Sequence, residues 1–259
     1  MVETGNSLSI ELTEATAPTP THAVLAVHKT LTPTAQCSSC ALRHICMASS
    51  LGDADVLRLH DVVRNWRMVK QSQALYRAGD PFQSIYVLRS GSFKTVLSHE
   101  NGREYVSGFF LPGETVGLDG IATDVHTCDA IALEDSAVCV IPFHLLETLC
   151  REVRSLQQHV HRLLSAEIVR ETGQMMLLGN LSAEQRVASF LLSISDRLRR
   201  RGYSSTAFTL RMTREDIGSY LGMTLETVSR TLSRFQQEEL IRVRGKQIEL
   251  LDPEALDLR

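Results

Sequence analysis

Three cysteines lie close together near the start of the chain, in the spacing C-x2-C-x5-C. These are Cys37, Cys40 and Cys46, and with the distant Cys128 they form a candidate set of four metal ligands. Thiolates are soft ligands that bind zinc and iron–sulfur clusters. The six cysteines are spread unevenly along the chain. Because a reducing compartment keeps such thiols free, we expect a metal centre rather than disulfides.

The spacing alone leaves more than one kind of centre open. Structural zinc sites favour two close pairs of cysteines, whereas this chain would join a triplet in an arm to one distant cysteine. That arrangement favours an iron–sulfur cluster over zinc. A reversible disulfide between Cys37 and Cys40, in a protein without iron, is a further alternative.

Length and composition are those of an ordinary globular protein. The 259 residues are enough for two modest domains, and 43% of them are hydrophobic. The sequence has no run of about 18 apolar residues and no signal peptide pattern, so we expect no membrane span and a cytoplasmic location. It also has no Ser/His/Asp set, phosphate-binding loop or HExxH motif, which argues against an enzyme.

Charge is distributed unevenly along the chain. The formal net charge is −3, yet residues 197–246 hold eleven Lys or Arg against five Asp or Glu. A basic block on an otherwise acidic chain suits the phosphate backbone of nucleic acid. A solvated basic surface would give the same count, so charge alone does not decide.

The pattern of turns and apolar residues predicts an α+β protein. Turn residues recur through the first half, as in antiparallel sheets, and Asn101-Gly102 suits a tight hairpin turn. Helical periodicity follows Pro142, and Ser182 with Gln185 forms a capping box that opens a further helix. We expect a flexible tail (1–30), a cysteine-rich arm (31–50), an antiparallel β-roll (51–141), a long dimerisation helix (142–180) and a winged helix-turn-helix domain (181–259).

The predicted long helix carries a seam with residues spaced 4, 3, 4 and 3 apart. Such spacing is typical of a helix that pairs with its own copy. A carboxylate on the seam would face its symmetry mate, and like charges there oppose pairing. The simpler alternative for this carboxylate is a surface position outside the seam. The seam residues are Leu164, Ile168, Glu171, Met175 and Leu178.

Residues 213–252 have the spacing of a helix-turn-helix followed by a wing. Ile217 and Leu221 form the inner face of a first helix, Gly222 supplies a left-handed turn, and Thr224 can cap the second helix. Exposed residues near the start of that second helix reach base edges in the major groove. An ordinary helical hairpin is the alternative. The outward-facing candidates for binding double-stranded DNA are Glu226, Thr227, Ser229, Arg230 and Arg234.

The side chains of the second helix have the chemistry needed to read bases. Arg230 can donate two hydrogen bonds to O6 and N7 of guanine, and Glu226 can accept one from a cytosine amine. A carboxylate on a DNA-facing surface repels phosphate, so Glu226 is unfavourable there unless it reads a base.

In this order, the roll, the long helix and the winged module resemble the cyclic-AMP receptor (CRP/FNR) family of bacterial regulators. With C-x2-C-x5-C ahead of the roll, the chain resembles the FNR/ANR-type oxygen sensors over about residues 35–252. The segment EDIG (215–218) and the string of Glu226, Ser229 and Arg230 match motifs of that branch.

The resemblance implies a transcription regulator that senses oxygen through a [4Fe-4S] cluster. In the family the fourth ligand lies late in the roll, at the position that we match to Cys128; Cys139 and Cys150 are then expected to be core thiols. The cluster-loaded protein would form a homodimer and bind TTGAT-like inverted repeats. It would act with RNA polymerase on genes of anaerobic metabolism.

One departure from the cyclic-nucleotide branch concerns the ligand of the roll. Residues 113–117, Gly-Glu-Thr-Val-Gly, resemble the start of a nucleotide-binding turn. An anionic phosphate there needs a cationic partner, but residues 117–149 contain no Lys or Arg. We therefore expect no bound cyclic nucleotide.

Overall fold

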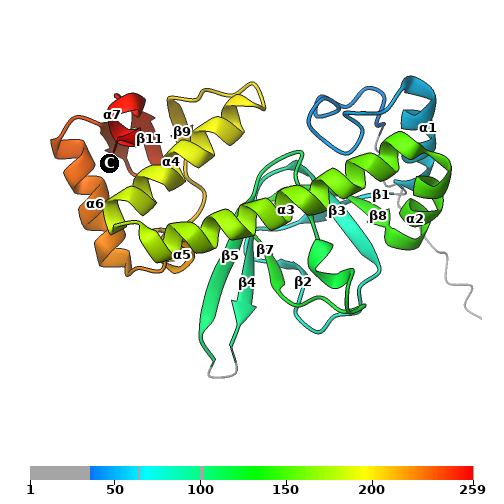
Figure 1. Ribbon diagram of the computed structural model, residues 1–259, viewed down its shortest axis with the longest axis horizontal. Coiled ribbons are helices and arrows are strands. Elements are labelled where there is room, and N and C mark those ends of the chain that lie inside the picture. Colours follow the sequence, from blue (N-terminus) through cyan, green and yellow to red (C-terminus); the bar gives the residue numbers. More distant parts are fainter. Residues whose placement is uncertain (1–35, 64, 100–101, 259) are drawn as a thin grey trace, which may run out of the picture. The chain divides into compact units, whose positions relative to one another are not determined.

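Antiparallel strands dominate the first half of the computed structural model, which describes residues 36–63, 65–99 and 102–258 (Figure 1). The strands form two four-stranded sheets, in the orders β1-β8-β3-β6 and β2-β7-β4-β5. The predictions of a flexible tail over 1–30 and of a turn at Asn101 lie outside the described residues. The strands are β1 (Asn65–Val69), β2 (Ala74–Tyr76), β3 (Ser84–Ser90), β4 (Phe93–Ser98), β5 (Glu104–Phe110), β6 (Thr115–Val116), β7 (Asp129–Ala132) and β8 (Ser136–Pro142).

The interior of the roll is apolar and tightly filled. Phe93 and Val138 have no exposed surface and lie in one cluster drawn from both sheets. Between β3 and β4 the chain turns at Gly91, whose φ is +82°. A Cβ atom there would lie 2.0 Å from the Ser136 Oγ, so only glycine fits. The predicted antiparallel β-roll is confirmed.

The helical stretch predicted over 142–180 is divided into two helices. They are α2 (Phe143–Glu152) and α3 (Arg154–Asn180). The helices are separated by Val153, whose φ of −113° and ψ of 93° are extended, and whose side chain is buried. The prediction of one continuous helix is therefore wrong at this residue. Burial of Val153 beside Leu149 and Leu156 outweighs the helical pattern there.

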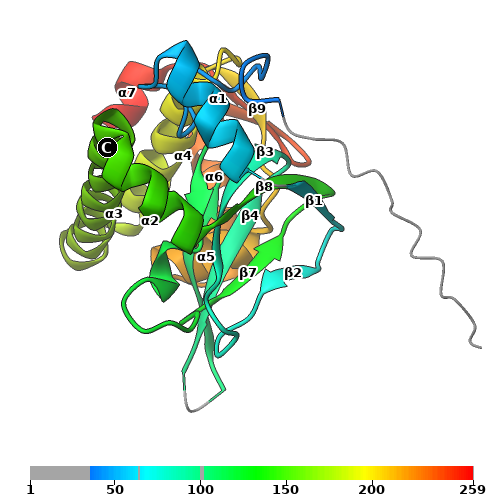
Figure 2. The same cartoon turned by 90° about the vertical axis from the view of Figure 1, so that its right-hand side faces the viewer.

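A second core joins the cysteine arm to these helices. The arm, residues 36–51, contains turns and leads into α1 (Asp53–Val62), which packs against α2 (Figure 2). Met47 and Ala48 of the arm are buried in one cluster with Leu156 of α3. Within the described residues, no helix is long and apolar enough to cross a membrane.

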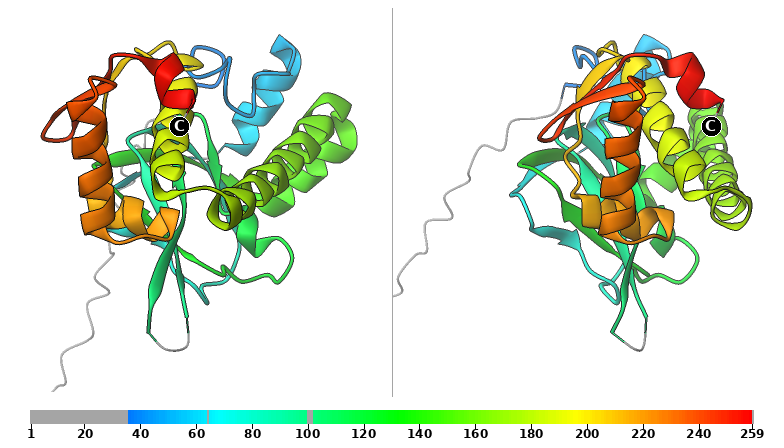
Figure 3. Two further views of the ribbon diagram at one scale, coloured as in Figure 1. Left: turned by 60° about the vertical axis from the view of Figure 1, so that its left-hand side comes forward. Right: turned by 90° about the vertical axis from the view of Figure 1, so that its left-hand side faces the viewer.

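The C-terminal part is a winged helix-turn-helix, as predicted (Figure 3). Ser182 and Gln185 form the predicted capping box, Gly222 is left-handed with φ of +62°, and the Thr224 hydroxyl accepts a hydrogen bond from the Thr227 amide. The elements are α4 (Ala183–Arg199), β9 (Ala207–Thr209), α5 (Arg214–Leu221), α6 (Leu225–Gln237), the wing strands β10 (Ile241–Arg244) and β11 (Gln247–Leu250), and α7 (Pro253–Asp257).

A charged cluster links the end of α4 to the roll. The Glu114 carboxylate accepts hydrogen bonds from Arg197 Nη2 and Arg201 Nη2, each at 2.5 Å, and from the Leu111 amide at 2.9 Å. Burial alone would raise the pKa of Glu114, but Arg197 and Arg201 reverse the effect and lower it. Glu114 is therefore ionised at neutral pH.

We predict that Glu114→Ala destabilises the protein by about 3 kcal/mol, because two arginines would lose their partner in a poorly solvated place. Urea denaturation at pH 7 measures this. Since the folded-state pKa of Glu114 is depressed, its contribution is present at neutral pH and lost as the pH falls through that pKa. The matched control, Glu104→Ala on exposed β5 surface, should change stability by less than about 0.5 kcal/mol. Equal effects of the two variants would contradict this account of the cluster.

Candidate metal centre and DNA-reading face

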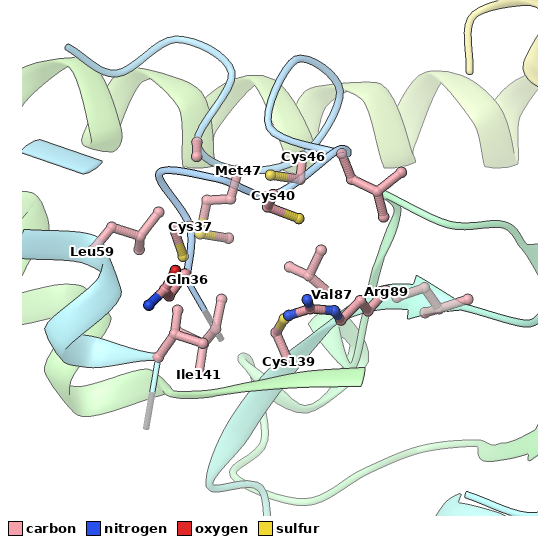
Figure 4. A pocket seen from close by; sticks show the side chains of 14 residues that line it. Gln36, Cys37, Cys40, Cys46, Met47, Leu59, Val87, Arg89, Cys139 and Ile141 are labelled. Carbon is pink, nitrogen blue, oxygen red and sulfur yellow. The ribbon is translucent and has the colours of Figure 1, made fainter. Parts of the chain in front are cut away.

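Four cysteines line one pocket between the arm and the roll (Figure 4). Cys37, Cys40 and Cys46 come from the arm, and Cys139 comes from β8. Apart from Gln36 and Arg89, the other lining side chains are apolar. They are Leu42, Met47, Ala48, Leu59, Val63, Val87, Leu88 and Ile141.

The sheet register fixes the position of Cys139. It lies opposite Trp66 of β1 on one side and Val87 of β3 on the other. Side chains alternate along a strand, so Cys139 and Ile141 face the pocket while Val138 points into the roll. Strand β8 is thus covered on both faces, and Cys139 is held by a central strand.

Cys128 does not join this group. Its side chain is buried in the roll interior, in the cluster that contains Tyr76 and Phe93. Burial, followed by the nearby Asp119 carboxylate, raises the pKa of Cys128 to about 12. We therefore correct the expectation that Cys128 is the fourth ligand, because it lies in a different core from the other three cysteines. The residue that the structure brings to them is Cys139, which we had expected to be a core thiol.

Burial in the pocket raises the pKa of Cys37, Cys46 and Cys139. Burial and the neighbouring cysteines raise the pKa of Cys37 to about 12. Burial is also the largest cause for Cys139, whose pKa rises to about 11, and it raises the pKa of Cys46. Metal binding must therefore release these protons.

The donor set of the pocket fits a metal that prefers sulfur. Four thiols from the arm and β8 line one largely apolar pocket, and none of the described residues that line it is a carboxylate. In the part of the chain that the structure describes, no three His, Cys, Asp or Glu side chains are already gathered around a single ion position. Binding would thus draw the arm cysteines toward Cys139. Cys150, on α2, is partly buried beside the same core and does not line the pocket, as expected of a structural thiol.

Helix α3 presents an apolar face to solvent. Ile168 is 65% exposed and Met175 is 73% exposed, while Leu178 is 36% exposed. Glu171 lies on the same face and is exposed, and Leu164 is half-buried. The predicted seam is thus largely exposed to solvent, although Leu164, Ile168 and Glu171 also line a groove between α3 and the roll.

Arg170 of α3 lines a groove between this helix and the roll. Its guanidinium lies 5.3 Å from the Phe110 ring centroid and pairs with Glu167 at 2.5 Å. The carboxylates of Asp119, Glu167 and Glu171 line the same groove. The described side chains of the groove are therefore more negative than positive. The cation that does line it, Arg170, lies outside residues 117–149, the range that the sequence prediction considered.

Helix α6 exposes its first turns. Glu226 and Arg230 are exposed, and Thr227 and Ser229 are half-buried. Arg234 lies one turn further on and forms ion pairs with Glu184 of α4 and with Glu238. The structure therefore leaves Arg230 available for a ligand but engages Arg234 within the module.

Two features of the pocket were not predicted from the sequence: the place of Cys139 and the presence of Arg89. The run AVCVI gives no alternation, so it does not reveal which residues of β8 face outward. The pairing of β8 with β1 and β3, which brings Trp66 and Val87 beside Cys139, could not be derived from local patterns.

Known proteins share this architecture. The model of the Crp-like helix-turn-helix domain matches residues 185–259, and that of the cyclic nucleotide-binding domain matches residues 66–153. The structure of FixK2 from Bradyrhizobium japonicum aligns with a TM-score of 0.69 and 29% identity, covering 74% of this chain and 94% of that one.

Two relatives extend the similarity to nearly the whole chain. The transcriptional regulatory protein btr of Bordetella pertussis is 45% identical over 218 residues, covering 84% of this chain and 90% of that protein. The fumarate and nitrate reduction regulatory protein of Yersinia pestis is 40% identical over 220 residues, covering 85% and 88%. Both are named as regulatory proteins and neither as an enzyme. The chain therefore belongs to the CRP/FNR family and is a DNA-binding transcription regulator of the FNR/Anr type.

Proposed function

We propose that this regulator senses oxygen through a [4Fe-4S] cluster held by Cys37, Cys40, Cys46 and Cys139. The observation that carries the proposal is the pocket in which these four thiols, from an arm and a sheet, meet an apolar lining. Cysteine thiolates are the usual ligands of such clusters. The resemblance to FNR/ANR-type sensors supports iron over zinc. When bound, the cluster would supply a centre that oxygen oxidises.

The protein's own residues would bind and shield this centre. Cys37, Cys40 and Cys46 of the arm would hold the centre as thiolates together with Cys139, which the sheet holds in place. Leu42, Met47 and Leu59 border the pocket and keep water out. The chain thus separates a rigid ligand from three adaptable ones.

Contacts between the arm and α3 would carry the state of the centre to the rest of the chain. Ser50 Oγ lies 3.1 Å from His159 Nδ1 on α3. Met47 and Ala48 pack in one cluster with Leu156 of α3. A displacement of the arm therefore acts on the first turns of α3.

We infer that α3 pairs with its copy in a homodimer. Ile168, Met175 and Leu178 would gain by burial. Two Glu171 carboxylates would meet near the two-fold axis and oppose association. The balance makes dimerisation sensitive to a small change at the start of α3.

The output is sequence-specific binding to DNA in the cytoplasm. Arg230 would read guanine, Glu226 a cytosine amine and Ser229 a neighbouring base, in TTGAT-like inverted repeats. The bound dimer would act with RNA polymerase at genes of anaerobic metabolism. The roll would not need a cyclic nucleotide, because the carboxylates that line its groove disfavour an anion.

The ligand set is tested by visible absorption with iron and sulfide assays on protein purified without oxygen. Cys37→Ser, Cys40→Ser, Cys46→Ser and Cys139→Ser should each lose the brown chromophore, whereas the matched controls Cys128→Ser and Cys150→Ser should keep it. Wild-type protein should hold about four iron and four sulfide per chain and should bleach in air. A colourless protein containing zinc would refute oxygen sensing and leave the DNA-binding activity standing.

We predict that Glu171→Ala strengthens dimerisation in air by about tenfold or more, since about 1.4 kcal/mol corresponds to a factor of ten. Removal of the paired carboxylates relieves repulsion while the apolar seam remains. Sedimentation under oxygen measures this, with a DNA mobility shift as the second readout. Glu147→Ala removes the same charge from an exposed position on α2 and should stay monomeric. If the Glu171→Ala protein is monomeric in air, repulsion between the two carboxylates is not what prevents dimerisation.

We predict that Arg230→Ala weakens binding to a TTGAT-like repeat by about 1–3 kcal/mol and relaxes the preference for guanine. Anaerobic binding to sites with each base at that position tests this. Arg234→Ala is the contrast, because Arg234 pairs with Glu184 and Glu238. The Arg234→Ala variant should change the affinity for all of these DNA sites by the same factor. Unchanged guanine preference in Arg230→Ala would remove this residue from base reading.

A further inference from the structure

Arg89 brings a positive charge to the pocket that holds the four cysteines. It is the last but one residue of β3 and lines the pocket with Cys37, Cys40, Cys46 and Cys139 (Figure 4). Arg89 is not among the ligands and has no part in the DNA-reading face. Its presence in a lining that is otherwise almost wholly apolar calls for a physical reason.

The sheet places this charge beside Cys139. Val87 of β3 pairs with Cys139 of β8, and Arg89 follows two residues later, at the irregularity of β3 between Leu88 and Ser90, where its side chain lines the same pocket. Figure 4 shows the guanidinium next to the Cys139 side chain, on the side of the pocket opposite the arm. The position of Arg89 therefore depends on strand register.

An aromatic ring helps to hold the guanidinium in this orientation. The Arg89 guanidinium carbon lies 5.9 Å from the centroid of the Trp66 ring. Trp66 is the β1 residue that pairs with Cys139 on the other side of β8. A cation at this distance is attracted by the negative face of the ring. Trp66 and Arg89 thus flank the same cysteine.

The charge acts on the thiols in the direction that favours metal binding. Burial raises the pKa of Cys139 to about 11, and Arg89 opposes that rise through its charge and a side-chain hydrogen bond. Arg89 also opposes the rise at Cys37, where burial is again the largest cause. A ligand must be a thiolate to bind metal. The guanidinium of Arg89 lies in the lining of the pocket beside Cys139, where thiolate charge would gather if metal bound.

We propose that Arg89 is a positioning residue for the metal centre, whose permanent charge offsets the negative charge of the bound thiolates and orients Cys139 toward them. The inference rests on the proposed four-cysteine site. Four thiolates in an apolar pocket repel one another and lose hydration, and a fixed cation beside them reduces both costs. Hydrogen bonds and charges around the sulfurs of a cluster also set its reduction potential.

The inference is tested on reduced, metal-free, full-length protein with Co²⁺ as the probe. Cobalt bound to thiolates absorbs in the visible and near-ultraviolet, so affinity is measured without any DNA-binding activity. Arg89→Gln should bind Co²⁺ about 10-fold to 100-fold more weakly, the range typical for loss of an outer-shell partner. Arg89→Lys keeps the charge and should recover part of the affinity. Arg77→Gln removes an exposed arginine that pairs with Asp129 outside the pocket and should bind as the wild type does.

Salt dependence separates a charge effect from a packing effect. Arg89 is exposed at the rim of the pocket, so part of its effect is screened by salt. The difference between wild type and Arg89→Gln should shrink when salt rises from about 0.05 M to about 0.5 M. A difference that is constant with salt, and that Arg89→Lys does not reduce, would overturn the proposal in favour of mere packing.

Failure of the inference can be told apart from failure of the site. If wild type binds Co²⁺ through thiolates, Cys139→Ser abolishes this, and Arg89→Gln binds as tightly as wild type, then Arg89 has no such role while the four-cysteine site stands. If Cys139→Ser leaves the cobalt spectrum unchanged, or wild type shows no thiolate–cobalt absorption, the four-cysteine site itself fails and the role of Arg89 fails with it.

Discussion

The apolar cluster between the cysteine arm and the helices is the interaction on which the rest of this protein depends. Residues 36–51 form turns closed by local backbone hydrogen bonds, such as Arg43 N–H to the Cys40 carbonyl, and belong to no described helix or sheet. Their position rests on the burial of side chains such as Met47 and Ala48 against Leu156. Full burial of one large apolar side chain contributes about 1.5–3 kcal/mol, so a few of them suffice to hold the arm. Because the cluster includes the start of α3, the arm cannot move far without changing the packing of that helix.

The exposed face of α3 is where a change in the packing of the arm would affect dimerisation. Ile168 and Met175 are largely exposed in the single chain, and Glu171 lies among them. Burial of apolar side chains across a two-fold axis favours association, whereas removing two carboxylates from water costs several kcal/mol per ion. Two opposing terms of similar size leave a small net free energy. A change of about 2.7 kcal/mol at the first turns of α3 is then enough for about a hundredfold change in the dimer population.

The winged module could be predicted from sequence because its signals are local. Ser182 caps α4, Thr224 caps α6, and Gly222 takes the left-handed turn between α5 and α6. Each of these needs only neighbours within a few residues.

The roll was also recognisable from its turns, but the fourth cysteine was not. Strand β8 is covered by the roll interior on one face and by the arm and helices on the other. Such a strand reads as an unbroken apolar run, so nothing in AVCVI distinguished Cys139 from its neighbours. The helix break at Val153 escaped prediction for a related reason, since a distant core determines it.

Burial of the pocket cysteines has a consequence for the charge of the pocket. The raised pKa values of Cys37, Cys46 and Cys139 mean that these groups are neutral thiols near pH 7 when no metal is present. A neutral thiol behaves as a small apolar side chain, so Cys37, Cys46 and Cys139 suit the apolar lining of the pocket. Binding of the proposed centre would replace protons by bonds to the thiolates and would draw the arm toward Cys139. The roll interior, where Cys128 is buried, takes no part in this exchange. Any movement of the arm on binding would therefore act on the cluster beneath it, which includes Leu156 of α3.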